Sequence, residues 1–212
     1  MLLPVLLAAL LALLAPPAGA VAFPPDCRIP RATLTAGSLA VGTPSRGRLV
    51  RGVLFPAETP DAFTWNLPGR FGPNPAFRRW GTEKLVLTLE CVFARYRSRR
   101  PEAARVGVAD LSLPRGGRFG RRYGGLGHAS HRNGRDADVL YPRIDGCECP
   151  AEDPEEVDTI RAQELIEAFV RAGAQYVFVS PVLYERLLLW GPRGVVIPLR
   201  HHDSHMHVRI RR

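Results

Sequence analysis

The chain has 212 residues, of which 46% are hydrophobic and 23% are charged, and its formal net charge at pH 7 is +9. This length provides one domain with a hydrophobic core and leaves too little chain for a second domain of ordinary size. After residue 22, no segment has the roughly 20 consecutive apolar residues of a membrane-spanning helix, so we expect no stable membrane insertion of the mature protein.

Residues 1–22 form an apolar run of Leu, Ala and Val that ends in prolines and small residues. This composition is typical of a secretory signal peptide with a cleavage region after the apolar core. No Lys or Arg precedes the run, so the amino terminus alone would supply the positive end. We expect a secreted or periplasmic protein of the cell envelope.

The chain contains four cysteines, Cys27, Cys91, Cys147 and Cys149. In an oxidising compartment an even number favours disulfides, and three pairings of four cysteines remain open. The closely spaced Cys147 and Cys149 would also suit a metal, but a matching second pair is absent from the sequence. We therefore favour disulfides.

Arginines carry most of the positive charge and gather at residues 97–100, 115–122 and 209–212. Such a surface attracts polyanions, which for a secreted protein are cell-wall polymers and peptide carboxylates. A cytoplasmic protein of this charge would suggest nucleic acid instead. A solvated arginine-rich surface explains the same pattern.

The amino-terminal part, residues 23–78, is rich in Pro and Gly, which predicts loops with short strands. A helix follows, with Thr82 as its N-cap and Pro101 at its end. Its core face is predicted from the helical spacing of Leu85, Leu89, Val92 and Tyr96.

The second half alternates strands with one long helix. That helix is predicted over residues 154–172, with Asp153 as N-cap and Gly173 as its stop. The apolar spacing assigns its core face to Val157, Ile160, Glu164 or Leu165, Ala168 and Phe169. Short helical character is expected at residues 182–190. Strands are predicted at residues 105–110, 137–141, 176–179, 195–199 and 205–210.

The histidines are confined to two short stretches of the chain. Independent structural histidines would be spread more evenly, so this grouping predicts one shared site. The six are His128, His131, His201, His202, His205 and His207.

His131 precedes Asp138 by seven residues across a turn marked by Gly134, a spacing that suits two ligands of one metal. His207 lies in the last predicted strand and supplies a third ligand. Asp136 is an alternative that needs a different strand register. Two histidines and one carboxylate leave a fourth tetrahedral position open, which is typical of catalytic zinc. Zinc lowers the pKa of a bound water to about 7 and polarises a carbonyl, which favours acyl hydrolysis.

The remaining histidines have candidate catalytic roles. Strand alternation places His205 on the same face as His207, where it would move protons or stabilise an oxyanion. His128 and His202 would orient ligands or assist the transition state.

The stretch 125–138, Gly-x-Gly-His-Ala-Ser-His-x-x-Gly-x-Asp-x-Asp, and the ending 202–209, His-Asp-x-His-x-His-Val-Arg, closely resemble the penicillin-insensitive murein endopeptidases. They also resemble the wider group of D-alanyl-D-alanine carboxypeptidases, lysostaphin-like enzymes and hedgehog domains. The resemblance covers about residues 79–212, whereas residues 23–78 match less securely. Ser204 departs from the aspartate often found in the ending.

This resemblance implies an α+β fold with a small antiparallel sheet flanked by helices, of the hedgehog and D-Ala-D-Ala-peptidase type. It implies a zinc peptidase core at residues 79–212 that cleaves D-alanyl to diaminopimelate cross-links of peptidoglycan peptide stems. The residue roles that it implies are zinc binding by His131, Asp138 and His207, catalysis by His205, and further active-site functions for His128 and His202.

Three other functions stay open. A zinc D-Ala-D-Ala carboxypeptidase would use the same metal site, with an arginine such as Arg209 holding the terminal carboxylate. An inactive zinc-binding cell-wall module would keep the ligands without the reaction, although His205 beside a complete ligand set disfavours it. A nucleic-acid-binding protein would leave the histidine spacing unexplained.

Overall fold

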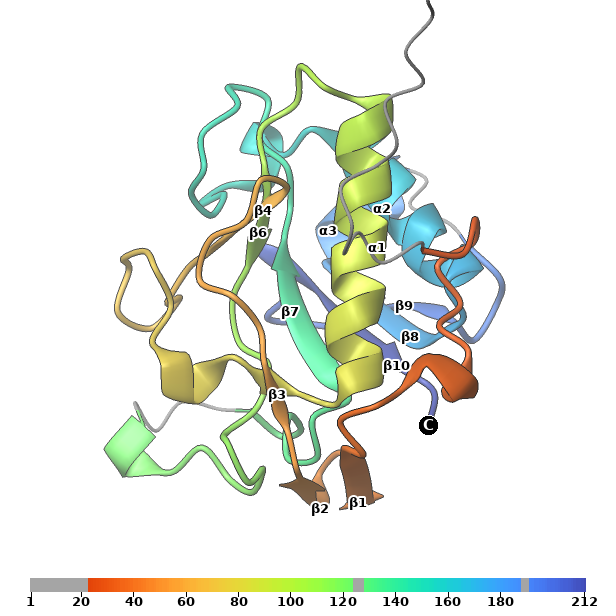
Figure 1. The fold of residues 1–212 in the computed structure, drawn as a ribbon. Helices are drawn as coiled ribbons and strands as arrows, with labels where there is room; N and C mark the ends of the chain where they lie inside the picture. Colours follow the sequence, from red (N-terminus) through yellow and green to blue (C-terminus); the bar gives the residue numbers. More distant parts are fainter. Residues whose placement is uncertain (1–22, 124–127, 188–190) are drawn as a thin grey trace, which may run out of the picture.

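The computed structural model describes residues 23–123, 128–187 and 191–212 (Figure 1). The predicted signal peptide lies outside these residues, as do residues 124–127 and the end of the segment 182–190. None of the helices within the described ranges has the length and apolar character needed to cross a membrane.

In the described part of the chain, short strands and 3-10 turns precede Glu83, and the longer helices and strands lie from there onward. The α-helices are α1 (Glu83–Arg99), α2 (Thr159–Arg171) and α3 (Pro181–Leu187). Single 3-10 turns are η1 (Arg31–Thr33), η2 (Ala76–Arg78), η3 (Arg121–Tyr123) and η4 (Pro154–Glu156). The strands are β1 (Leu39–Thr43), β2 (Arg46–Val50), β3 (Val53–Leu54), β4 (Ala62–Thr64), β5 (Trp80–Gly81), β6 (Val106–Val108), β7 (Asp136–Leu140), β8 (Ala174–Val179), β9 (Val196–Pro198) and β10 (His205–Ile210).

The main sheet has six strands in the order β4-β6-β7-β10-β8-β9. Its centre is antiparallel, as expected, but β4 pairs parallel with β6 and β8 pairs parallel with β9. The expected small antiparallel sheet is therefore a mixed sheet, with a parallel pair of strands at each edge. The reason is connectivity: α1 lies between β4 and β6, and α3 lies between β8 and β9, and a helical crossover returns the chain in the same direction.

Helix α1 has the predicted bounds. The Thr82 side chain accepts a hydrogen bond from the Leu85 backbone N–H at 3.3 Å, and the four predicted core residues are buried. The core below the helices contains alternate residues of two strands, namely Ala137, Val139, Met206 and Val208. Figure 1 shows α1 standing across β7 and β10. The other face of these strands is therefore the one that carries Asp138 and His207.

The long helix predicted over residues 154–172 is divided. Asp153 caps only η4, after which Val157 is extended and buried, and forms a bridge with Arg143. Asp158 then caps α2 through the backbone N–H of Arg161. This break changes the helical register, so Ile160 is 72% exposed instead of buried. The buried residues of α2 are Ala162, Leu165, Ile166 and Phe169.

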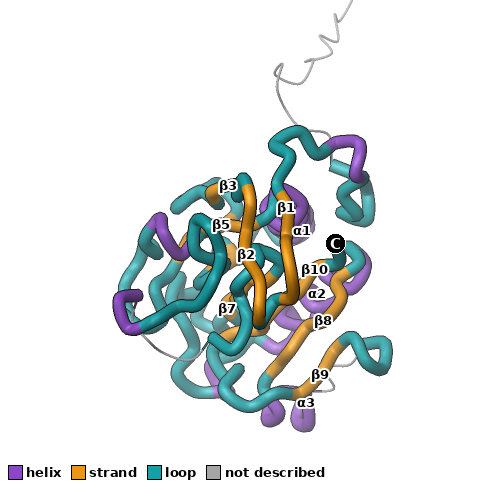
Figure 2. The backbone as a smooth tube through the Cα atoms, turned by 90° about the horizontal axis from the view of Figure 1, so that it is seen from below, coloured by secondary structure: helices purple, strands orange, loops and turns teal. Residues whose placement is uncertain are grey.

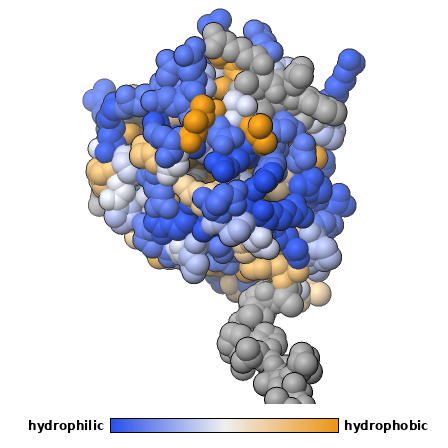
Figure 3. Space-filling model, turned by 90° about the horizontal axis from the view of Figure 1, so that it is seen from above, coloured by the Kyte–Doolittle hydropathy of each residue, from blue (hydrophilic) through white to orange (hydrophobic). Residues whose placement is uncertain are grey.

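All four cysteines form disulfides, Cys27 with Cys91 and Cys147 with Cys149. The alternative of a cysteine metal site is thus wrong. The first disulfide fastens the amino-terminal segment to α1. The β1–β2 hairpin lies near the amino-terminal end of the same helix (Figures 1 and 2). Hydrophilic residues cover most of the face in Figure 3, as the net charge suggests.

Candidate metal centre

Two neighbouring strands place a carboxylate and an imidazole opposite each other. In the antiparallel register of β7 and β10, Asp138 is the partner of His207, and Asp136 is the partner of Arg209. All of these side chains lie on the face turned away from the helices. Pairing through the backbone therefore fixes the separation of Asp138 and His207 before any ligand is present.

His131 reaches the same point from the loop before β7. It is a non-glycine residue with a positive φ of 63°, and its backbone N–H donates to the Oδ2 atom of Asp136 at 2.9 Å. Its Nδ1 atom lies 2.5 Å from the carbonyl oxygen of Leu111, to which it donates. The Nε2 atom is consequently left as the acceptor that faces β7 and β10.

The three predicted ligand residues converge to a nearly equilateral triangle. The His131 Nε2 and His207 Nδ1 atoms each lie 3.1 Å from the Oδ1 atom of Asp138 and 3.1 Å from each other. Metal–ligand distances of about 2.0–2.1 Å in a tetrahedral zinc site separate ligand atoms by about 3.3 Å. The triangle thus has the size of one face of such a site.

The hydrogen bonding of Asp138 also fits a metal. Its side chain is 1% exposed, yet within the described residues neither carboxylate oxygen has a hydrogen-bond partner. A buried carboxylate without hydrogen bonds is costly unless it binds a cation. Burial opposes a charge on His207, but Asp136 and Asp138 outweigh burial and raise the pKa of His207 to about 9. The surroundings therefore favour a positive charge between these side chains.

His128 lies beside the triangle and shares part of it. One ligand atom from each of His128, His131 and Asp138 can be chosen so that all lie within 4.8 Å of one another. The His128 Nδ1 atom is 3.9 Å from the Oδ2 atom of Asp138, farther than the 3.1 Å of His207 from Oδ1. The geometry therefore favours His207 as the third ligand and leaves His128 adjacent.

The structure adds Asp110 and Arg78, which the sequence analysis missed. Asp110 Oδ2 lies 2.6 Å from His128 Nε2, and Arg78 Nε donates to Asp110 Oδ1 at 2.6 Å. Burial would raise the pKa of Asp110, but His128 and Arg78 outweigh it and lower that pKa. The position of Asp110 at the end of the strand predicted over residues 105–110 was the only signal in the sequence for this pair.

Asp136 is a support for two of the histidines. It accepts the backbone N–H of His131, lies 3.4 Å from the Nε2 atom of His207, and accepts from Arg209 Nε at 2.6 Å. Its side chain is fully buried. Asp136 thus lies against the outer side of the His207 ring, and Asp138 lies against its inner side.

The other carboxy-terminal histidines lie at the rim. The His205 Nε2 atom is 3.7 Å from the Oδ1 atom of Asp138, and burial lowers the pKa of His205 to about 4. The His202 ring is 5.1 Å from that of His205, and burial also lowers the pKa of His202. Both imidazoles are therefore neutral near pH 7. His201 is exposed and lies outside this arrangement.

Comparison with known proteins agrees with the resemblance seen in the motifs. A family model described as penicillin-insensitive murein endopeptidase matches residues 41–181. A protein of that name from Salmonella heidelberg is 29% identical over 126 residues, which are 49% of this chain and 44% of that protein. A second, from Salmonella paratyphi C, is 27% identical over 158 residues, which are 63% of this chain and 54% of that protein.

The matches cover only part of the chain and only some of the candidate site residues. The chain spans about half the length of the curated relatives that it matches. The family match includes His128, His131 and Asp138 and ends before His205 and His207. The family match therefore says nothing about His205 and His207, and their proposed roles rest on the geometry of β10 alone.

Proposed function

The chain belongs to the penicillin-insensitive murein endopeptidase family, and from this premise we propose that it is a zinc-dependent endopeptidase of the cell envelope. Its proposed substrate is the peptide cross-link of bacterial peptidoglycan, of the D-alanyl to diaminopimelate type. The single observation that carries the proposal is the triangle of His131, Asp138 and His207. The finer fold assignment, to the hedgehog and D-Ala-D-Ala-peptidase type, belongs to the same proposal.

His131, Asp138 and His207 are the proposed zinc ligands. Imidazole nitrogens and a carboxylate suit zinc, and three protein ligands leave one position open for water or substrate. When bound, zinc supplies Lewis-acid polarisation of a carbonyl and a lowered pKa of water. The chain itself supplies the orientation, because Leu111 accepts the Nδ1–H of His131 and Asp136 lies 3.4 Å from the far side of His207.

His205, His128 and His202 are the proposed catalytic histidines. His205 is neutral and only 14% exposed, so its ring is available to take up a proton at the edge of the triangle. His128 donates its Nε2–H to Asp110, which orients the ring, and its Nδ1 atom lies 3.9 Å from the Oδ2 atom of Asp138. His202 packs against His205 and restricts the orientation of that ring.

The remaining assignments concern organisation and location. Residues 1–22 are proposed to be a signal peptide, residues 23–78 the loop-rich part of the domain, and residues 79–212 the zinc peptidase core. The location would be periplasmic or extracellular, as the two disulfides favour an oxidising compartment. The proposed partner is the peptide stem of peptidoglycan, with no nucleic acid.

The test is mass spectrometry of purified cross-linked muropeptides after incubation with the mature protein. We expect conversion of dimers to monomers, loss of that conversion with a zinc chelator, and its return when zinc is added. Loss of a single terminal alanine would instead establish a carboxypeptidase. Intact muropeptides with folded, zinc-loaded protein would favour an inactive zinc-binding module.

A further inference from the structure

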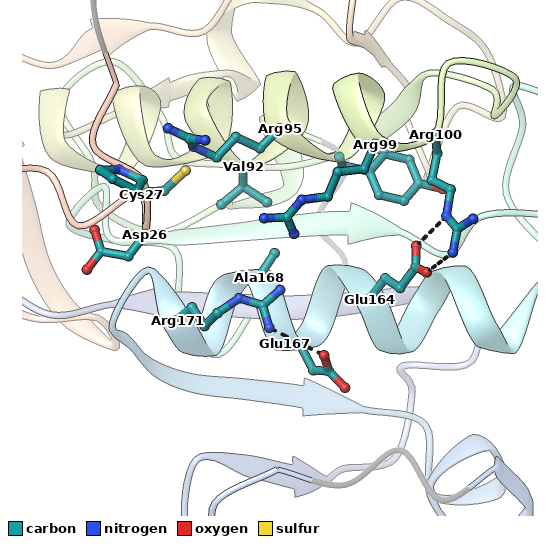
Figure 4. Close-up of a pocket in the computed structure, with 12 residues that line it drawn as sticks. Asp26, Cys27, Val92, Arg95, Arg99, Arg100, Glu164, Glu167, Ala168 and Arg171 are labelled. Carbon is teal, nitrogen blue, oxygen red and sulfur yellow. Dashed lines mark hydrogen bonds and ion pairs between the residues drawn. The ribbon is translucent and has the colours of Figure 1, made fainter.

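A separate hollow lies between α1 and α2 (Figure 4), on the opposite side of the sheet from the metal centre. Its volume is about 700 Å³, within the range of small-ligand sites. The amino-terminal segment around Cys27 closes one end, and the disulfide to Cys91 of α1 holds that segment in place. We call this hollow the interhelical pocket.

Each helix lines the interhelical pocket with one stripe of side chains. The stripes follow the spacing of three and four residues that places side chains on one face of a helix. From α1 they are Val92, Arg95, Tyr96 and Arg99, with Arg100 at its C-cap, and from α2 they are Glu164, Glu167, Ala168 and Arg171. In Figure 4, Arg99 and Arg171 extend into the gap between the helices from opposite sides.

The carboxylates of the pocket are already paired. Glu164 accepts from Arg100 Nε at 3.1 Å, and Glu167 lies 3.3 Å from Arg171 Nη1. Asp26, at the closed end, lies 3.4 Å from Arg28 Nε, outside the pocket lining. The acidic groups of the lining are thus engaged with guanidinium groups.

Arg95 and Arg99 differ in that no carboxylate among the described residues contacts them directly. Neither forms an ion pair with a carboxylate in the part of the chain that the structure describes, and Arg95 Nη2 donates only to the carbonyl oxygen of Phe23, at 3.1 Å. The two arginines are one helical turn apart on α1, with the apolar surface of Val92 and Tyr96 beside them. Two positive charges therefore face one cavity.

We propose that the interhelical pocket binds a phosphate-bearing anion through Arg95 and Arg99. A guanidinium offers a planar fork of donors that matches phosphate oxygens, and two forks suit a group with several oxygens better than a single carboxylate. Val92 and Ala168 would contact the organic part of the ligand. The site is independent of the proposed peptidase reaction, because it lies between the two helices, on the opposite side of the sheet from His207.

The test is a titration of isotopically labelled, zinc-loaded protein followed by backbone amide NMR. The probes are inorganic phosphate, a glycerol phosphate phosphodiester oligomer, and acetate. We expect phosphate and the oligomer to shift amides of α1 and α2, and acetate to bind at least about tenfold more weakly. Binding of the oligomer would identify a polymer as the source, and binding of inorganic phosphate alone would identify a free phosphate.

Variants separate a built site from the overall charge of the protein. Arg99→Gln is expected to weaken phosphate binding about tenfold, since it removes one charge-assisted pair of hydrogen bonds. The double variant Arg95→Gln/Arg99→Gln should abolish it. The matched control is Arg46→Gln/Arg48→Gln on β2, which removes two exposed charges outside the pocket lining. Glu167→Gln should strengthen binding, because it releases Arg171.

The proposal is wrong if phosphate leaves the amides of α1 and α2 unmoved while the thermal unfolding of the protein is normal. It is equally wrong if the β2 control weakens binding as much as Arg99→Gln, since the effect would then be one of net charge. Shifts confined to β7 and β10 would place the phosphate at the metal centre and would also overturn it.

Discussion

The Nε2 atom of His128 and the Oδ2 atom of Asp110 are 2.6 Å apart, and the same carboxylate is held by Arg78 and by the side-chain amide of Asn74. Asp110 and Arg78 are 1% and 4% exposed at their side chains. Asp110 thus links His128, in the loop before β7, to the buried guanidinium of Arg78.

Asp110→Asn should lower zinc affinity or turnover about 10- to 100-fold, the usual effect of losing a residue that supports a metal site. It should also lower the midpoint of thermal unfolding, because the charge of Arg78 remains buried without its partner. Metal titration, muropeptide turnover and calorimetry measure the three quantities. Asp145→Asn, which changes an exposed carboxylate paired with Arg143, is the control. Unchanged zinc affinity and turnover would refute the positioning of His128 by Asp110.

His207→Ala and His205→Ala should have different effects. We expect the first to lose both zinc and activity, and the second to retain zinc and lose activity, because only His207 lies at 3.1 Å from both other proposed ligands. Metal content by mass spectrometry and muropeptide conversion give the two readouts. Loss of zinc from His205→Ala would overturn this division of roles.

The two aspartates of β7 should also differ. Asp138→Asn removes a proposed ligand and should abolish stoichiometric zinc binding. Asp136→Asn should retain one zinc per chain with affinity reduced about 10- to 100-fold, because Asp136 supports His131 and His207 from outside the triangle. Competition with a chromophoric chelator measures both affinities. The reverse order would identify Asp136 as the ligand.

The two disulfides should contribute very differently to stability. The Cys27–Cys91 bond spans a sequence separation of 64, for which the chain-entropy model gives about 4 kcal/mol. The Cys147–Cys149 bond spans a separation of 2, for which the same model gives about 1.5 kcal/mol. Denaturant unfolding of the two double Cys→Ser variants compares them. Equal losses of unfolding free energy would contradict the entropic account.

Burial of the Tyr96 hydroxyl should lower the free energy of unfolding at alkaline pH. Its hydroxyl is buried and has no hydrogen-bond partner among the residues described, and burial raises its pKa to about 12. The unfolded chain, with a pKa of about 10, loses this proton first, so the free energy of unfolding should fall between about pH 10 and pH 12.

Tyr96→Phe should remove that part of the decline and leave stability at pH 7 nearly unchanged, as denaturant unfolding at each pH would show. Tyr141→Phe is the contrast, because the Tyr141 hydroxyl accepts the Ser180 backbone N–H at 3.1 Å. That variant should be less stable already at pH 7. A steep alkaline decline that persists in Tyr96→Phe would show that other groups cause it.

Local patterns in the sequence were sufficient for several features. The Thr82 cap and the spacing of Leu85 and Leu89 defined α1, because capping and helical periodicity depend on neighbours within a few residues. Alternation in β10 likewise placed Met206 and Val208 in the core and His207 on the other face. The grouping of the histidines predicted one shared site, and the structure brings five of the six together while His201 lies outside.

The tertiary structure decided what depends on residues far apart in the chain. The bridge between Val157 and Arg143 divided the predicted helix and exposed Ile160, and helical crossovers made the edge strand pairs parallel. The contact of Asp110 with His128 and the pairing of Cys27 with Cys91 also join distant segments. Such contacts depend on packing of the whole chain, whose energy is shared among many residues and leaves no local pattern in the sequence.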